Sequence, residues 1–231
     1  MRTRRSWRAT SWETTVARNV VGCCLVLVAV LGSAACSGSG DGVATGGTAK
    51  AVGTTAPWAR DVQTGDLMWT VTQDGLTVTA YDMGRDTTTQ DSYFSDDATN
   101  EPLVKAGSPV AMVNIVLTNS GTTTAYVATD TPSVRALTTD HPYPQGLEKI
   151  TPVSDRQMSS HGVWYHSTRS PHPGYNPPYP LEPGQSCAMG FALPLTLGDD
   201  WLFFPSAYVY DTPETGIGDM VMFEEQAYTL T

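Results

Sequence analysis

Two short runs decide the fold class of this chain: Leu67-Met-Trp-Thr-Val-Thr72 and, after Gln73-Asp74-Gly75, Leu76-Thr-Val-Thr-Ala-Tyr81. Apolar and polar residues alternate in both runs, which is the period of a β-strand with one buried face. An Asp-Gly pair between two such runs is a strong hairpin signal, because both turn residues then adopt positive φ. We therefore predict two antiparallel strands joined by a tight turn at Asp74 and Gly75.

The same two-residue period recurs along the rest of the chain. The run from Val110 to Thr118 places Val113, Ile115 and Leu117 on one face. Further strand-like segments are residues 122–128, 133–137, 185–195, 201–210 and 220–230. No window carries a sustained 3.6-residue apolar stripe, so helix is predicted to be marginal. Seven or eight short strands separated by turns predict an all-β fold, an immunoglobulin-like antiparallel β-sandwich over residues 67–231.

The first 35 residues have the pattern of a cleaved secretory signal peptide. Five arginines stand against one acid, Glu13, and an apolar run from Val20 to Leu31 follows them. Small residues, Ser33-Ala-Ala35, then precede Cys36. This order of a basic region, an apolar region and small residues is typical of exported proteins. An uncleaved membrane span is the less favoured alternative, because a span needs about 20 apolar residues.

Cys36 after Ser33-Ala-Ala35 resembles the lipobox of bacterial lipoproteins, although that motif usually has Leu where Ser33 stands. In that family the cysteine thiol receives a diacylglyceryl group and becomes the first residue of the mature chain. The resemblance implies lipidation of Cys36 and a place on the outer face of the cell membrane. Two acyl chains give stable anchoring, whereas one gives only marginal binding. An ordinary signal peptide, with Cys36 incidental, is the alternative.

Residues 36–66 are rich in Gly, Ser, Thr and Ala and contain one aromatic residue, Trp58. Such a composition buries too little apolar surface to offset the entropy of ordering. We therefore expect residues 36–66 to be a lipidated N-terminus and flexible linker that holds the domain away from the bilayer.

Charge limits the classes of partner. The whole chain has 13 basic and 23 acidic residues, and removing the five arginines and one glutamate of residues 1–35 leaves 8 and 22, a net charge of −14. Nucleic-acid binding needs clustered Lys and Arg, so we expect no nucleic-acid partner.

The cysteine content excludes a disulfide within the mature chain. Past Cys36 only Cys187 remains, so no disulfide within the mature chain is expected.

Two segments resemble a known family. The strand ending at Asn119-Ser-Gly121, and Leu181-Glu-Pro-Gly-Gln-Ser-Cys-Ala-Met-Gly-Phe-Ala-Leu-Pro194 with the aromatic strand after it, resemble the immunoglobulin-like, telokin-like domains of uncharacterised Gram-positive lipoproteins. The resemblance covers about half of residues 67–231. Its motifs mark strand ends and turns, so it implies fold and location and carries no catalytic residue. The insertion at residues 138–180 departs from the family pattern.

That insertion holds the candidate ligand or partner patch. Four aromatic residues lie among prolines, which stiffen a loop: Trp164, Tyr165, Tyr175 and Tyr179. Aromatic faces on a stiff loop can stack on sugars or anchor a protein partner. The alternative is that these rings cover one edge of the sandwich and are half buried.

The sequence offers little catalytic chemistry. His161, His166 and His172, with His141 and Asp155 nearby, match no metal-ligand spacing, and the acids Asp91, Asp96, Asp97 and Glu101 match no calcium loop. Ser186 lies in a near match to G-x-S-x-G without a following helix, and Cys187 is expected to be a buried apolar residue. We therefore expect a binding or interaction module with no cofactor or metal. The alternatives are a hydrolytic or metal-dependent envelope enzyme and a structural spacer.

Overall fold

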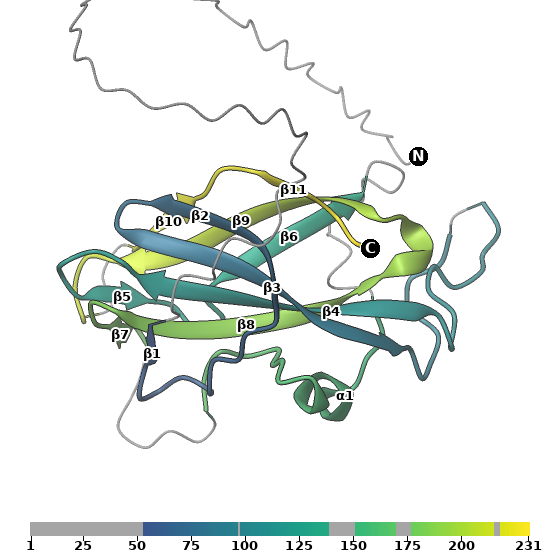
Figure 1. The fold of residues 1–231 in the computed structure, drawn as a ribbon, viewed down its shortest axis with the longest axis horizontal. Coiled ribbons are helices and arrows are strands. Elements are labelled where there is room, and N and C mark those ends of the chain that lie inside the picture. Colours follow the sequence, from purple (N-terminus) through teal and green to yellow (C-terminus); the bar gives the residue numbers. More distant parts are fainter. Residues whose placement is uncertain (1–52, 97, 139–150, 170–176, 215–217) are drawn as a thin grey trace, which may run out of the picture. The chain divides into compact units, whose positions relative to one another are not determined.

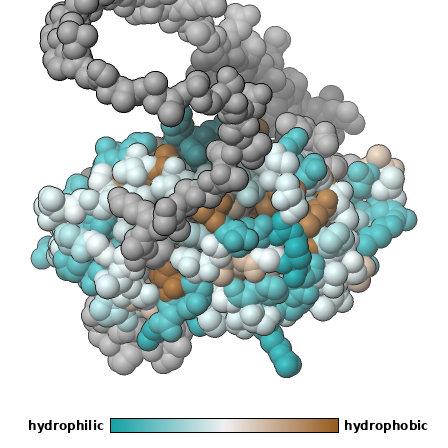
Figure 2. All heavy atoms as spheres, viewed as in Figure 1, coloured by the Kyte–Doolittle hydropathy of each residue, from teal (hydrophilic) through white to brown (hydrophobic). Residues whose placement is uncertain are grey.

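The structure, a computed structural model, describes residues 53–96, 98–138, 151–169, 177–214 and 218–231. They form two β-sheets that face each other (Figure 1). On the described surface seen in the same view, hydrophilic and intermediate residues predominate and hydrophobic ones are scattered (Figure 2). The chain divides into two compact units, Met1–Val43 and Ala44–Thr231, and every described residue belongs to the second. No helix within the described ranges has the length and apolar content of a membrane span.

The first sheet has five strands in the order β1-β8-β4-β3-β2. Their bounds are β1 Thr54–Thr55, β2 Asp66–Gln73, β3 Leu76–Thr87, β4 Pro109–Asn119 and β8 Gln185–Pro194. All pairs are antiparallel except β1 with β8, which is parallel. The predicted β2–β3 hairpin is present, with Asp74 at φ 50° and Gly75 at φ 76° in its turn.

The second sheet is built around β9, whose two sides each pair with two shorter strands. On one side lie β5 and β6, with β7 beyond β5, and on the other side lie β10 and β11. The bounds are β5 Ala125–Val127, β6 Ser133–Thr138, β7 Tyr179–Leu181, β9 Asp200–Tyr210, β10 Gly218–Met222 and β11 Gln226–Thr229. A 3-10 turn, Leu195–Leu197, joins β8 to β9.

Alternate residues of both sheets meet in one core. On β4 the side chains of Val113, Ile115 and Leu117 are fully buried there, as the sequence period predicts. Trp201 and Phe203 of β9 face them from the second sheet. The prediction of an all-β sandwich is thus confirmed.

The sandwich begins earlier than the sequence suggests. The prediction that a flexible linker continues to residue 66 is wrong for residues 53–66, because this segment is packed onto the sheets. Thr54 and Thr55 pair with β8, and Trp58 is fully buried in the core. The indole Nε1 of Trp58 donates a hydrogen bond to the carbonyl oxygen of Pro180 at 2.6 Å. A nonlocal partner therefore orders a segment whose own composition favours disorder.

Two strand boundaries differ from those that the sequence pattern suggests, and the marginal helix content takes the form of one short helix. β3 continues past a bulge to Thr87, beyond the alternating run that ends at Tyr81. The predicted strand over residues 220–230 is two strands, β10 and β11, interrupted at residues 223–225. A short helix, α1 (Asp155–Ser160), begins with a capping box formed by Ser154 and Gln157. The capping box satisfies two of the backbone N–H groups at the start of the helix, although no apolar stripe marks this segment in the sequence.

Residues 151–169 cover part of the outer face of the five-stranded sheet. Met158 of α1 and Val163 pack with Val110, Met112 and Ala192 in a second apolar cluster. The backbone N–H of Gly190 donates to the carbonyl oxygen of Trp164 at 2.8 Å, which ties this segment to β8. The rest of that outer face, toward the β2–β3 turn, is not covered by this cluster, and the candidate site lies there.

Candidate functional site

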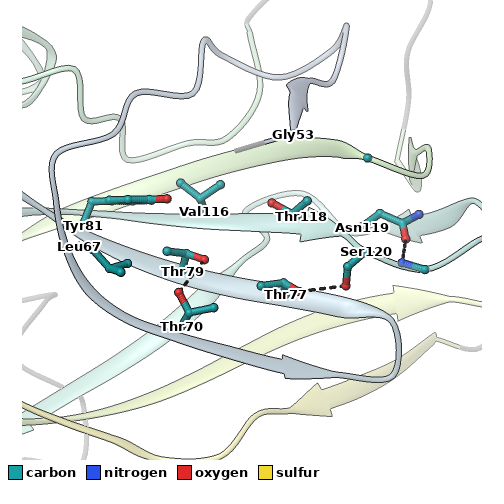
Figure 3. Close-up of a pocket in the computed structure, with 12 residues that line it drawn as sticks. Gly53, Leu67, Thr70, Thr77, Thr79, Tyr81, Val116, Thr118, Asn119 and Ser120 are labelled. Atoms are coloured by element: carbon teal, nitrogen blue, oxygen red, sulfur yellow. Dashed lines mark hydrogen bonds between the residues drawn. The ribbon is translucent and has the colours of Figure 1, made fainter. Parts of the chain in front are cut away.

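A trough of about 310 Å³ lies on the part of the outer face of the five-stranded sheet that no other described segment covers (Figure 3). Outward-facing residues of β2, β3 and β4 form its floor, and three glycines line its rim. The glycines are Gly53, Gly121 and Gly184, and the other lining residues are Leu67, Thr70, Thr77, Thr79, Tyr81, Val116, Thr118, Asn119 and Ser120. None of these side chains carries a charge at neutral pH. The volume is at the lower end of the range of small-molecule sites.

Hydroxyl groups are the main polar feature of the trough. Thr70 Oγ1 donates to Thr79 Oγ1 at 3.2 Å, and Thr77 Oγ1 donates to Ser120 Oγ at 2.9 Å (Figure 3). Thr118 Oγ1 lies 2.8 Å from Ser186 Oγ on β8. These pairs hold the hydroxyls in fixed positions across neighbouring strands. Each hydroxyl oxygen has two lone pairs, so a paired hydroxyl still has capacity to accept a hydrogen bond from a ligand.

Tyr81 stands at the end of the trough nearest the covered part of the sheet. Its side chain is almost fully buried against Val116 and Ala188. Figure 3 shows its hydroxyl pointing along the sheet toward Val116 and Thr118. Between described residues no hydrogen bond is found for this hydroxyl, and it is not one of the fully buried atoms without a partner (Trp69 Nε1, Asn114 Oδ1, Trp164 Nε1 and Ser167 Oγ), so it opens onto the trough. Burial raises the pKa of the Tyr81 phenol, so the group is a protonated donor at neutral pH.

Asn119 fixes the opposite end of the trough. Its side chain is buried, and its Nδ2 donates to the carbonyl oxygens of Thr123 at 2.8 Å and Leu181 at 2.7 Å. Its Oδ1 accepts a hydrogen bond from the backbone N–H of Gly121 at 3.0 Å. One amide therefore ties together the end of β4, the turn after it and β7. The Asn119-Ser-Gly121 sequence, which marks a strand end, thus also forms one end of the site.

A second cavity, of about 340 Å³, opens between the two sheets beside β8 and β6. Its lining is mostly apolar and includes Ile115, Val134, Met189 and Phe191. This cavity offers apolar contact to a ligand but few hydrogen-bonding groups. The trough combines apolar surface with fixed hydroxyls and a donor without a partner, which is the pattern of specific small-molecule sites.

The predicted aromatic residues occupy two places. Tyr179 lies on β7, is 9% exposed, and stacks on Trp58 with ring centroids 4.7 Å apart. Trp164 and Tyr165 are half buried and line a small hollow of about 80 Å³ with Arg60 and other residues, and Tyr179 is not among them. The guanidinium carbon of Arg60 lies 4.5 Å from the centre of the Trp164 ring.

Tyr165 acts as a support for the covering segment. Its hydroxyl donates to the carbonyl oxygen of Val153 at 3.2 Å. Burial, with a smaller contribution from the negative charge of Asp155, raises the pKa of Tyr165. These contacts fit the alternative of half-buried rings that cover part of the sandwich for Trp164, Tyr165 and Tyr179. Tyr175 lies outside the described residues.

The histidines of the insertion contact different carboxylates. His161 Nε2 lies 3.5 Å from Asp86 Oδ2, and its Nδ1 lies 3.2 Å from the carbonyl oxygen of Met83. His166 Nδ1 lies 2.8 Å from Asp130 Oδ1. Across the ranges that the structure describes, no three His, Cys, Asp or Glu side chains come together as metal ligands. His141 and His172 lie outside those ranges.

The remaining candidate residues make local contacts or are buried, as expected for residues with a structural role. Glu101 forms an ion pair with Lys105, Asp91 accepts a hydrogen bond from the backbone of Ala106, and Asp96 caps its own loop through the N–H groups of Ala98 and Thr99. Asp97 lies outside the described residues. Ser186 is buried beside Thr118, and Cys187 is fully buried in the core. Burial raises the pKa of the Cys187 thiol to about 12, so it is inert at neutral pH. Cys36 also lies outside the described residues.

No significant match to this chain was found among protein-family models, curated proteins or solved structures. The resemblance to telokin-like lipoprotein domains therefore rests on the sequence motifs alone.

Sequence reasoning missed the trough. Its outward threonines are ordinary strand residues in a sequence, and alternation alone does not distinguish a bare outer face from a covered one. The available signal is the repeated Thr at every second position of the hairpin, at Thr70, Thr72, Thr77 and Thr79. Such a pattern places several hydroxyls on one face of two paired strands.

Proposed function

We propose that this protein is a lipid-anchored binding module on the outer face of the cell membrane, and that the trough holds an uncharged ligand bearing hydroxyl or amide groups. The observation that carries the proposal is the phenol of Tyr81, a protonated donor without a partner among the described residues, aimed along a floor of fixed hydroxyls. A sugar unit of the cell envelope is the first ligand to test, because sugars present hydroxyls to such groups and apolar C–H faces to Val116 and Leu67.

The lining supports binding more than bond cleavage. General acid–base catalysis needs a group that exchanges a proton near the working pH, most often His, Asp or Glu. No lining residue of the trough is of those types, and Tyr81 keeps its proton at neutral pH because burial raises its pKa. This favours a binding module over the alternative of a hydrolytic envelope enzyme.

The trough lies close to the start of the sandwich. Gly53 lines it, and residues 37–52 separate Gly53 from Cys36. The likeness of residues 33–36 to a lipobox supports anchoring through Cys36. We expect the full-length chain to enter the detergent phase in Triton X-114 partition of cells that express it. Cys36→Ala is expected to move it to the aqueous phase or the medium; a variant that stays in the detergent phase would contradict lipid anchoring.

The ligand is tested by thermal melting of residues 37–231, which contain the whole sandwich. The probes are the trimer of N-acetylglucosamine, maltotriose and a soluble muropeptide. A ligand at a hundredfold excess over its dissociation constant stabilises the native state by about 2.7 kcal/mol, which raises the midpoint measurably. Tyr81→Phe removes only the free hydroxyl and is expected to abolish most of the rise.

Tyr93→Phe is the matched control. Tyr93 is 96% exposed on the loop between β3 and β4 and does not line the trough. The control should leave the rise unchanged. A rise that survives Tyr81→Phe would place the ligand elsewhere, and a rise with divalent metal alone would favour the enzyme. No rise with any probe would favour a structural spacer.

A further inference from the structure

The outer face of the second sheet carries an exposed patch of aromatic and methionine side chains, on the opposite side of the sandwich from the trough. Tyr208 of β9 is 37% exposed, and Met220 and Met222 of β10 are 59% and 52% exposed. Strand register places Met220 directly opposite Tyr208 and Gly218 opposite Tyr210. We call these five residues the Tyr–Met patch. Aromatic residues and methionine are enriched in protein interfaces, where Met adapts to varied partners.

Gly218 holds the two tyrosine rings in place. A Cβ at residue 218 would lie 2.4 Å from Tyr208 Cε1 and 3.0 Å from Tyr210 Cδ1, so only glycine lets both rings lie against the backbone of β10. The two rings are 5.2 Å apart, edge to face at 72°. The patch is therefore a packed, ordered surface whose aromatic groups lose little freedom when a partner binds.

β10 is also the edge strand of its sheet. Within the described residues it pairs with β9 alone and stands last in the strand order. An edge strand presents backbone N–H and C=O groups that can pair with another strand. The sequence Gly218-Asp-Met-Val-Met222 lacks the Pro and Lys that commonly protect such edges.

The charge around this edge has one sign. From Pro173 to Thr231 the chain has eight acidic residues and no Lys, Arg or His. Asp219 lies on β10 itself, and Glu224 and Glu225 follow it, all exposed. Arg135 of β6 is the one basic residue on the strands of this sheet, and it lies 5.0 Å from the Phe204 ring.

From these observations we infer that β10 and the Tyr–Met patch bind an extended, basic segment of a partner protein, which adds as a strand to the β10 edge. Backbone pairing supplies the docking geometry, alternate apolar side chains of the segment contact Met220 and Met222, and its Lys or Arg residues face Asp219 and the following glutamates. A second copy of this chain is disfavoured, because pairing β10 with β10 brings identical acidic groups together. The inference is independent of the trough and of its ligand.

The test uses residues 37–231 and two synthetic peptides, Lys-Val-Lys-Val-Lys-Val-Lys and Glu-Val-Glu-Val-Glu-Val-Glu, both blocked at their ends. Isothermal titration gives affinity, and amide hydrogen exchange locates the contact. The lysine peptide is expected to bind, more weakly as salt increases, and to slow exchange within residues 218–222. The glutamate peptide is expected not to bind.

Two variants separate the contribution of the acidic charge to binding from that of apolar side-chain contact. Asp219→Lys and the double change Met220→Thr with Met222→Thr are each expected to weaken binding by about tenfold or more. Tyr93→Ser, which removes an exposed aromatic ring far from β10 in the sequence, is the control and should bind as the parent does. Circular dichroism confirms that each variant is folded.

Four outcomes would overturn the inference: equal binding of both peptides, protection outside residues 218–222, full affinity in both variants, or no binding of the lysine peptide. Concentration-dependent dimerisation in sedimentation, abolished by the double Met variant, would instead assign the patch to a second copy of this chain. Protection of the patch by the N-acetylglucosamine trimer, but not by the lysine peptide, would assign it to a glycan.

Discussion

The indole of Trp58 lies nearly parallel to the ring of Tyr179, with centroids 4.7 Å apart and planes at 21°. Trp58 belongs to the segment before the first long strand, and Tyr179 belongs to β7 in the second sheet. The hydrogen bond from Trp58 Nε1 to Pro180 strengthens the same junction. Through this contact, residues 53–59 are part of the sandwich and help to close it.

We predict that Trp58→Ala lowers the free energy of unfolding by about 3–5 kcal/mol, because it leaves a cavity beside Tyr179 and removes a buried hydrogen bond. Urea unfolding of residues 37–231 measures the change. Trp58→Phe keeps a ring on Tyr179 and should cost clearly less. A fragment that starts at Asp66 lacks the whole junction and should melt well below residues 37–231. Equal midpoints for the two fragments would contradict a structural role for residues 53–65.

Asn119 joins three backbone groups at one end of the trough. We predict that Asn119→Ala lowers the free energy of unfolding by at least about 2 kcal/mol, because buried carbonyl and N–H groups lose their partner. Asn119→Asp should cost more, since it removes both N–H donors and adds a buried charge. Thr123→Ala, which keeps the carbonyl oxygen that Asn119 contacts, is the control and should be nearly neutral. Urea midpoints compare the four proteins.

Cys187 is the single thiol of residues 37–231. Burial raises its pKa to about 12, whereas in the unfolded chain it titrates near 9. Between these values the unfolded state loses the proton and the native state keeps it, so stability falls as pH rises from about 9 toward 12. Cys187→Ala should flatten this fall relative to the parent in urea unfolding at several pH values.

The same burial predicts the reactivity of this thiol. Ellman's reagent at pH 8 should leave Cys187 unmodified in the native protein and should modify it at once in urea. Rapid modification of the native protein would mean that the strand around Cys187 opens readily.

Gly190 on β8 lets the covering segment approach the sheet. A Cβ there would lie 2.3 Å from both the Val113 carbonyl oxygen and Val163 Cγ1. We predict that Gly190→Ala lowers stability by about 1–3 kcal/mol through overpacking and increases trypsin cleavage after Arg156 in α1. Adding Val163→Ala should restore part of the loss, because it removes one of the two clashes. An unchanged cleavage rate would show that residues 151–169 pack differently.

Much of the scaffold could be predicted from local patterns. The hairpin at Asp74 and Gly75 and the buried face of β4 follow from alternation and turn chemistry, which act between near neighbours in the chain. The same reasoning failed at residues 53–66 and at β7. There the residues are ordered by distant partners, such as Tyr179 and Pro180 for Trp58, which leave no local period.

The candidate site was harder to predict for a similar reason. The aromatic residues of the insertion are the candidate binding residues in the sequence. In the structure, however, Tyr179 is buried against Trp58, and Tyr165 supports residues 151–169. The residues that line the trough are mostly Thr, Ser and Gly, which are common on any strand surface. Their grouping depends on strand pairing across β2, β3 and β4.

The sequence by itself determined the all-β class, the main hairpin and the inward face of β4, because the two-residue period of a strand is a property of the local backbone. Only the tertiary structure decided which part of the outer face the other described segments leave uncovered. This division of the outer face depends on residues 151–169 packing over Gly190, and on Trp58 stacking on Tyr179 of β7. Both are contacts between segments that are distant in the chain, and a local sequence pattern does not predict such contacts.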